Sequence, residues 1–86
     1  MKTYRLYTYD VWGNANDGYE VNNVYCESQT YNIDPNWNDK QLINELKKLG
    51  LIKKGLHQKI EVGGNDLTIT FDYKGRPEFE LRLENN

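Results

Sequence analysis

Two side chains of this sequence have the chemistry of a nucleophile and its base: the thiol of Cys26 and the imidazole of His57, each the single residue of its type. A cysteine beside a histidine can supply a thiolate for covalent catalysis. Cys26 falls in a predicted strand and His57 in a predicted loop, and no motif brings them together. Because a buried cysteine in a strand usually packs as a small hydrophobic residue, we predict no catalytic pair.

Carboxylates are the next candidates, because two acids held in one cleft can act as general acid and general base. The predicted strands offer Asp10, Glu20, Asp72 and Glu80. Acids are common on any sheet surface, and no spacing marks two of these as a pair, so we interpret them as a solvated face. We predict that the protein is not an enzyme and has no catalytic residues.

The segment that ends at Gly18 resembles a calcium-binding loop in composition. Aligning Gly18 with the obligatory glycine of such a loop leaves Gly13 at the first ligand position. Ala15 then takes the third position, and Val24 takes the closing position that glutamate normally fills. The sequence also lacks a cysteine and histidine cluster for zinc and the lysine of a phosphate loop. We therefore predict no metal and no cofactor.

A basic segment is the strongest charge feature: residues 38–59 carry six cations and two anions, although the formal net charge is −2. It includes Lys47, Lys48, Lys53, Lys54 and Lys59, with His57 among them. Such a cluster could bind phosphates, but lysines near a helix C-terminus also complement the helix dipole. Residues 1–37, which hold most of the rings, carry two cations and five anions. Single-strand binders need rings and cations together, and here the two are separated along the chain, so nucleic-acid binding is our second hypothesis and not our first.

The C-terminal part has an acidic stripe at its outward-facing positions. The acids are Glu61, Asp72, Glu78, Glu80 and Glu84, against one cation, Arg82. Such a stripe could contact a basic protein surface, as a nucleic-acid mimic does. We favour the alternative that these are ordinary surface charges, which deter edge-to-edge pairing of strands.

The N-terminal part predicts a hairpin. Residues 3–12 alternate as a strand, residues 14–18 are dense in turn formers, and a second strand runs to about Ile33, where Asp34-Pro35 ends it. If Trp12 lies opposite Tyr19, a core face follows. That face carries Tyr4, Leu6, Trp12, Tyr19, Val21 and Tyr25. The other face carries Arg5, Tyr7, Tyr9, Val11, Val24 and Cys26.

A helix with clear ends follows the hairpin. Asn38 can cap it with Gln41 completing a capping box, although Asn36 is an alternative cap. Trp37 can pack on the first turn as a hydrophobic staple. Gly50 stands where a left-handed C-terminal cap is wanted. The apolar stripe between these ends is Leu42, Ile43, Leu46 and Leu49.

From Lys59 onward the pattern returns to a period of two, with turns at 63–66 and 74–77. We predict the order ββαβββ: an α+β fold whose antiparallel sheet has one short helix packed on one face. The length of 86 residues predicts a single domain over residues 1–86. There is no apolar run long enough for a membrane span or a signal peptide, so we expect a cytoplasmic protein that does not contact membranes.

The aromatic residues are unevenly distributed: six of the seven tyrosines and both tryptophans lie within the first 37 residues. One short helix cannot cover both hairpin faces, so the face that carries Tyr7 and Tyr9 is left for solvent, a second copy or a target. Tyrosine with asparagine, glycine and aspartate is typical of protein-binding paratopes. A sugar would also suit stacked rings, and a simple solvated face is the remaining alternative.

Three segments carry a resemblance to known proteins: residues 9–14, residues 17–22 and Gly75-Arg76-Pro77-Glu78-Phe79. They are similar to small uncharacterised proteins encoded by bacteriophages and other mobile elements. The resemblance spans most of the chain and brings no functional residues with it. It implies a class of role, the binding of a host or phage macromolecule.

We therefore predict a non-enzymatic protein-protein interaction module. Its predicted binding residues are Tyr7, Tyr9, Val11, Asn14, Asn16 and Val24, on one hairpin face and at the hairpin tip. The expected partner is a host or phage protein, and a homodimer would use the same face. The alternative is a nucleic-acid-associated protein that uses the basic segment.

Overall fold

The computed structural model describes residues 1–52 and 59–84, apart from the side chain of Asp66. Its elements are β1 (Lys2–Asn14), β2 (Gly18–Ile33), α1 (Asp39–Lys48), β3 (Lys59–Gly63), a 3-10 turn (Gly64–Asp66), β4 (Thr68–Tyr73) and β5 (Arg76–Leu83). The predicted order ββαβββ is confirmed. So is the end of the second strand at Ile33, where the chain turns into Asp34-Pro35.

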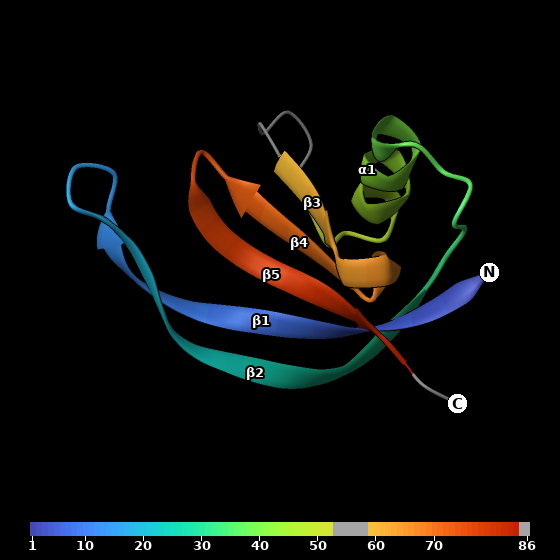
Figure 1. Ribbon diagram of the computed structural model, residues 1–86, viewed down its shortest axis with the longest axis horizontal. Helices are drawn as coiled ribbons and strands as arrows, with labels where there is room; N and C mark the ends of the chain where they lie inside the picture. Colours follow the sequence, from blue (N-terminus) through green and yellow to red (C-terminus); the bar gives the residue numbers. More distant parts are fainter. Residues whose placement is uncertain (53–58, 85–86) are drawn as a thin grey trace.

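The strands form one five-stranded sheet in the order β2-β1-β5-β4-β3 (Figure 1). All neighbouring strands are antiparallel. The hairpin β1–β2 and the meander β3–β4–β5 meet where β1 pairs with β5, and that pairing stops at Thr8 opposite Phe79. Beyond Thr8 the hairpin continues as a two-stranded ribbon that bends away from the helix (Figure 1).

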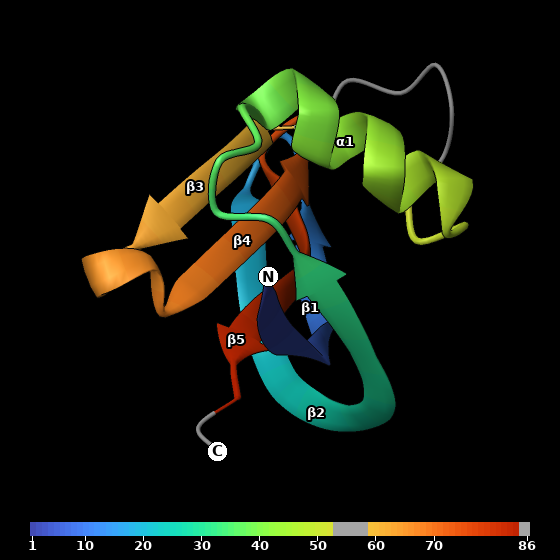
Figure 2. The same ribbon diagram turned by 90° about the vertical axis from the view of Figure 1, so that its right-hand side faces the viewer.

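One face of the sheet carries the hydrophobic core. Its buried residues are Tyr4, Leu6, Ile33, Leu42, Leu46, Ile52, Ile69, Phe71, Phe79 and Leu81. Phe71 and Phe79 are cross-strand partners, and their ring centroids stack 4.6 Å apart. Leu42 and Leu46 come from the first two turns of α1, so the helix contributes to this cluster. Figure 2 shows α1 crossing above β3 and β4, and Figure 1 shows the helix and the hairpin tip at opposite ends of the molecule.

The opposite face, which we call the open face, is polar. Antiparallel partners share a face, so the register defines cross-strand rows of side chains. One row runs through Glu61, Thr70, Glu80, Tyr7 and Cys26. A second row contains Lys59, Asp72, Tyr9 and Val24. The predicted alternation of the meander is confirmed for Ile69, Phe71, Phe79 and Leu81, which are buried. Val62 and Leu67, predicted inward, are exposed, and Glu80, predicted outward, is buried.

The predicted hairpin pairing is wrong by one residue, because Trp12 lies opposite Glu20 and not Tyr19. The register shifts between Arg5 and Tyr7 and again between Asp10 and Val11. The second shift adds an extra residue to β2, as a β-bulge does, and exchanges the faces of the residues that follow. Val21 therefore lies opposite Val11, on the open face.

Two aromatic side chains assigned to the core are instead exposed. Trp12 is 61% exposed and Tyr25 is 50% exposed, whereas Tyr4 is buried as predicted. Trp12 lies on the part of the hairpin that extends past the pairing of β1 with β5, and Tyr25 lies on the edge strand β2, opposite the last paired residue Thr8. Neither belongs to the buried cluster that includes the helix residues. Tyr19, also assigned to the core, is only partly buried.

The helix ends match their predictions. Asn38 accepts a hydrogen bond from the Gln41 amide at 2.9 Å, and the Gln41 side chain accepts one from the Asn38 amide at 2.9 Å. At the other end Gly50 has φ 77°, and the Leu51 amide donates to the Leu46 carbonyl, which closes a Schellman motif. Leu49, predicted in the apolar stripe, is exposed. Within residues 1–52 and 59–84, no helix has the length and apolar character needed to cross a bilayer.

The capping box gives a test of local stability. Asn38→Ala should lower the free energy of unfolding by about 1 kcal/mol, because the Gln41 amide in the first helical turn loses its side-chain acceptor. Asn44→Ala is the matched control in the exposed middle of the same helix and should leave stability equal or slightly higher, since alanine favours helix. Urea denaturation of both variants measures the difference. An equal change in the free energy of unfolding for Asn38→Ala and Asn44→Ala would show that the cap contributes nothing.

Candidate functional site

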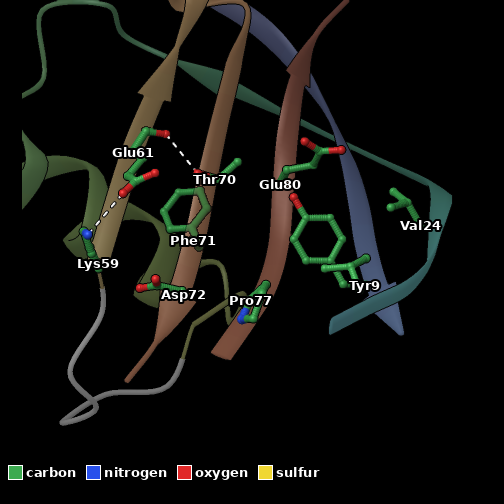
Figure 3. A pocket seen from close by; sticks show the side chains of 10 residues that line it. Tyr9, Val24, Lys59, Glu61, Thr70, Phe71, Asp72, Pro77 and Glu80 are labelled. Carbon is green, nitrogen blue, oxygen red and sulfur yellow. Dashed lines mark hydrogen bonds and ion pairs between the residues drawn. The ribbon is translucent and has the colours of Figure 1, made fainter. Parts of the chain in front are cut away.

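The open face is hollowed between the hairpin and the meander, with a cavity volume of about 340 Å³. We call this concavity the hollow. Its hairpin wall consists of Tyr9, Val21 and Val24. Its meander wall consists of Lys59, Glu61, Thr70, Asp72, Pro77 and Glu80, with Phe71 contributing at its base. Figure 3 shows these side chains arranged on either side of β5.

The hollow exists because the sheet curls. Val24 belongs to β2 and Glu61 to β3, and these are the two edge strands of the five. In a flat sheet, strands spaced about 4.8 Å apart would place the two edges too far from each other to line one small cavity. The sheet twist, increased by the bulges in β2, brings both edges around the open face. The concave surface is therefore a property of the whole sheet.

Glu80 is the buried charge of the open face. It is only 7% exposed, although it lies on the polar side of β5. Its Oε1 accepts a hydrogen bond from Arg82 Nε at 2.7 Å and forms an ion pair with Arg82 Nη2 at 2.5 Å. The Arg82 guanidinium in turn stacks over the Tyr7 ring, 4.1 Å from its centroid. Such charge-assisted and cation–π contacts compensate a carboxylate that has lost most of its water.

Tyr9 joins Glu80 to the hairpin. Its side chain lines the hollow together with Glu80, and its hydroxyl points toward the Glu80 carboxylate in Figure 3. Burial raises the pKa of Tyr9 to about 12, and the negative charge and hydrogen bond of Glu80 act in the same direction. At neutral pH the hydroxyl is therefore a stable donor. Tyr7 also has a raised pKa, mainly from a hydrogen bond with the Cys26 thiol.

The acidic stripe predicted on this face is largely neutralised by ion pairs. Glu61 pairs with Lys59 at 3.1 Å and Glu78 with Arg76 at 2.8 Å. Glu84 pairs with Arg5, and Glu80 with Arg82. Asp72 is the one acid of the stripe without an ion pair among the described residues. Its Oδ1 is also the one buried side-chain oxygen or nitrogen there that has no hydrogen-bond partner.

The predicted binding residues divide between the hollow and the tip. Tyr9 and Val24 line the hollow, Tyr7 lies beside it on the same face, and Val11 is half-buried next to Val21. The tip residues belong to a turn. Asn14 Oδ1 accepts from the amides of Asn16 and Asp17 at 2.9 and 2.8 Å, so Asn14 holds the turn closed. Asn16 is exposed there, outside the hollow.

The predicted basic segment is only partly described. Lys47 and Lys48 lie in the last turn of α1, and Lys48 pairs with Glu45 at 3.2 Å. Lys59 lies on β3 at the rim of the hollow. Lys53, Lys54 and His57 lie outside the described residues. Of these predicted lysines that the structure describes, two therefore lie on the helix and one on the sheet.

Of the residues considered for catalysis, Asp72 and Glu80 both line the hollow, whereas Cys26, Asp10 and Glu20 lie outside it. Cys26 is exposed on the edge strand β2, not buried as expected, because no strand or helix covers the outer side of β2. Asp10 accepts a hydrogen bond from Asn22 at 3.0 Å, and Glu20 is exposed near the tip. Among residues 1–52 and 59–84, no three acidic, histidine or cysteine side chains are grouped so as to hold a metal.

Sequence reasoning missed several residues of the hollow. Val21 was assigned to the wrong face, and Pro77 was interpreted only as part of a turn. Asp72 and Glu80 were noted as surface acids, but their burial depends on neighbours in other strands. Assigning these residues to the hollow requires the cross-strand register, and the sequence does not show where the bulges shift that register.

Comparison of the chain with protein-family models, with curated proteins and with solved structures finds no match.

The raised pKa of Tyr9 predicts a pH effect on stability. The neutral hydroxyl contributes stability that is fully present below pH 10 and is lost as the pH rises toward about 12. Glu80→Gln should lower the pKa of Tyr9 toward 10, because it removes the neighbouring negative charge. Titration of the Tyr9 ring by carbon NMR, assigned with Tyr9→Phe, measures this shift. Glu20→Gln at the exposed tip is the control and should leave the Tyr9 pKa unchanged.

Proposed function

We propose that this protein is a non-enzymatic protein-binding module that contacts its partner through the open face and the hollow. The observation that carries the proposal is the hollow itself, a concave surface to which both edge strands and β5 contribute. Concave sites with apolar walls and a few fixed polar groups are the usual form of binding sites.

The walls of the hollow have the chemistry of a protein interface. Val21 is 40% exposed and Val24 is 37% exposed, so both offer apolar area to a partner. Tyr7 and Tyr9 are held in place by Arg82 and Glu80, so a partner would meet rings that are already ordered. Rigid aromatic side chains bind at low entropic cost, which is why interfaces are enriched in them.

The resemblance to small phage and mobile-element proteins implies the kind of partner. We propose a host or phage protein in the cytoplasm as the target. A second copy of this chain would use the same face, which makes homodimerisation a competing outcome of the tests below. Nucleic-acid binding by the lysines stays a prediction without an observation to favour it, since Lys48 and Lys59 are already paired with acids.

Substitution of the hairpin wall tests this proposal. Val21→Ser/Val24→Ser removes apolar area from the hollow and leaves the Tyr9–Glu80 contact intact. We expect at least a tenfold loss of recovered partner when tagged protein is used to capture proteins from host lysate, because a central apolar contact commonly supplies more than 1 kcal/mol. The measurement is quantitative mass spectrometry beside wild type.

The matched control is Trp12→Ser/Tyr25→Ser, which removes exposed apolar side chains from the other face of the same hairpin. It should recover the same proteins as wild type. Loss of partners with the control but not with Val21→Ser/Val24→Ser would refute the assignment of the face. If nuclease treatment or raised salt empties every capture, nucleic acid is the partner, because phosphate contacts weaken steeply with salt.

A further inference from the structure

We propose that the hollow receives a cationic side chain, lysine or arginine, from the protein partner. This inference rests on the proposed function and names the chemistry that the hollow selects. The occupant is a basic segment of another protein. An anionic ligand and a purely apolar contact are the outcomes that would overturn it.

The charge balance of the hollow favours a cation. Lys59 lies in the hollow and Arg82 lies next to it. Lys59 is paired with Glu61 at 3.1 Å, and Arg82 is paired with Glu80 at 2.7 Å. An incoming anion would have to break one of these pairs. Asp72 lies in the hollow without an ion pair among the described residues. The charge left over in the lining is therefore negative.

The Asp72 carboxylate also has a geometric need for a donor. Its Oδ1 is buried and has no hydrogen-bond partner among the described residues. Buried polar atoms nearly always have partners, since an unpaired one loses its water without compensation. An ammonium or guanidinium group in the hollow would supply the donor and the opposite charge together. A neutral group could donate the hydrogen bond but would not supply the positive charge.

The remaining lining suits the stem of a basic side chain. The cavity volume of about 340 Å³ is at the lower end for ligand sites and is ample for one extended side chain. Val21, Val24 and Pro77 provide apolar surface along it. Lysine and arginine pack their methylene stems on such surfaces while their charged ends reach polar groups. Figure 3 shows Val24 on one side of β5 and Asp72 on the other.

Small-molecule probes test the charge preference directly. Titration of labelled protein with N-acetyl-lysine methylamide or N-acetyl-arginine methylamide should give saturable amide shifts at Thr70, Asp72 and Val24 in nitrogen–proton NMR spectra. The norleucine analogue, which keeps the stem and lacks the charge, should bind at least tenfold more weakly. Acetate, the anionic probe, should give no saturable shift.

Two substitutions should move the affinity in opposite directions. Asp72→Asn should weaken binding of the lysine probe about tenfold, the difference between a charged and a neutral acceptor. Lys59→Gln should strengthen it about threefold, because it removes the resident cation that attracts Asp72. Glu20→Gln, at the exposed tip outside the hollow, is the control and should change nothing.

The outcomes separate this inference from the proposed function. Equal binding of the norleucine probe, saturable binding of acetate, or weaker lysine binding by Lys59→Gln would each overturn the cation assignment. If Asp72→Asn captures partners as well as wild type while Val21→Ser/Val24→Ser does not, the inference is wrong and the protein-binding proposal stands. Spectra of each variant check folding, and Lys59→Gln, at a half-exposed position, keeps the test valid if Asp72→Asn unfolds.

Discussion

A carboxylate held almost entirely out of water joins the two halves of this molecule. Glu80 lies on the central strand β5, accepts a hydrogen bond from Arg82 Nε and pairs ionically with the same guanidinium, and lies beside the Tyr9 side chain of β1, whose pKa it raises. Loss of water makes an isolated buried charge costly, so the carboxylate requires these partners. Backbone pairing of β1 with β5 joins the hairpin to the meander, and the contacts of Glu80 add a side-chain link between the two walls of the hollow.

The remainder of the open face is organised around the same contact. Arg82 pairs with Glu80 on β5 and stacks on Tyr7 of β1, so this one side chain links the two strands. Tyr9 in turn positions the hairpin wall, since Val24 is its partner in β2. The sheet can therefore leave one face without a helix and still hold that face rigid, which is the condition for binding a partner without a large loss of entropy.

Sequence predicted the parts of the fold that local rules decide. The capping box of Asn38 and the glycine cap at Gly50 involve residues a few positions apart, and both are present as expected. The meander has no insertion before Phe71, so its alternation gave the correct inward residues. The hairpin does have an insertion, and one extra residue in β2 moved Val21 to the open face. Burial of Glu80 and Asp72 depends on neighbours distant in sequence, which alternation alone does not specify.

The contact between Tyr9 and Glu80 carries the central claim, and a double-mutant cycle measures it most directly. Free energies of unfolding of wild type, Tyr9→Phe, Glu80→Gln and the double variant, at neutral pH, give the coupling between the two side chains. The account predicts a coupling of about 1 kcal/mol or more, the net value of a hydrogen bond to a charged and largely buried acceptor. Strictly additive effects, with a coupling near zero, would contradict it.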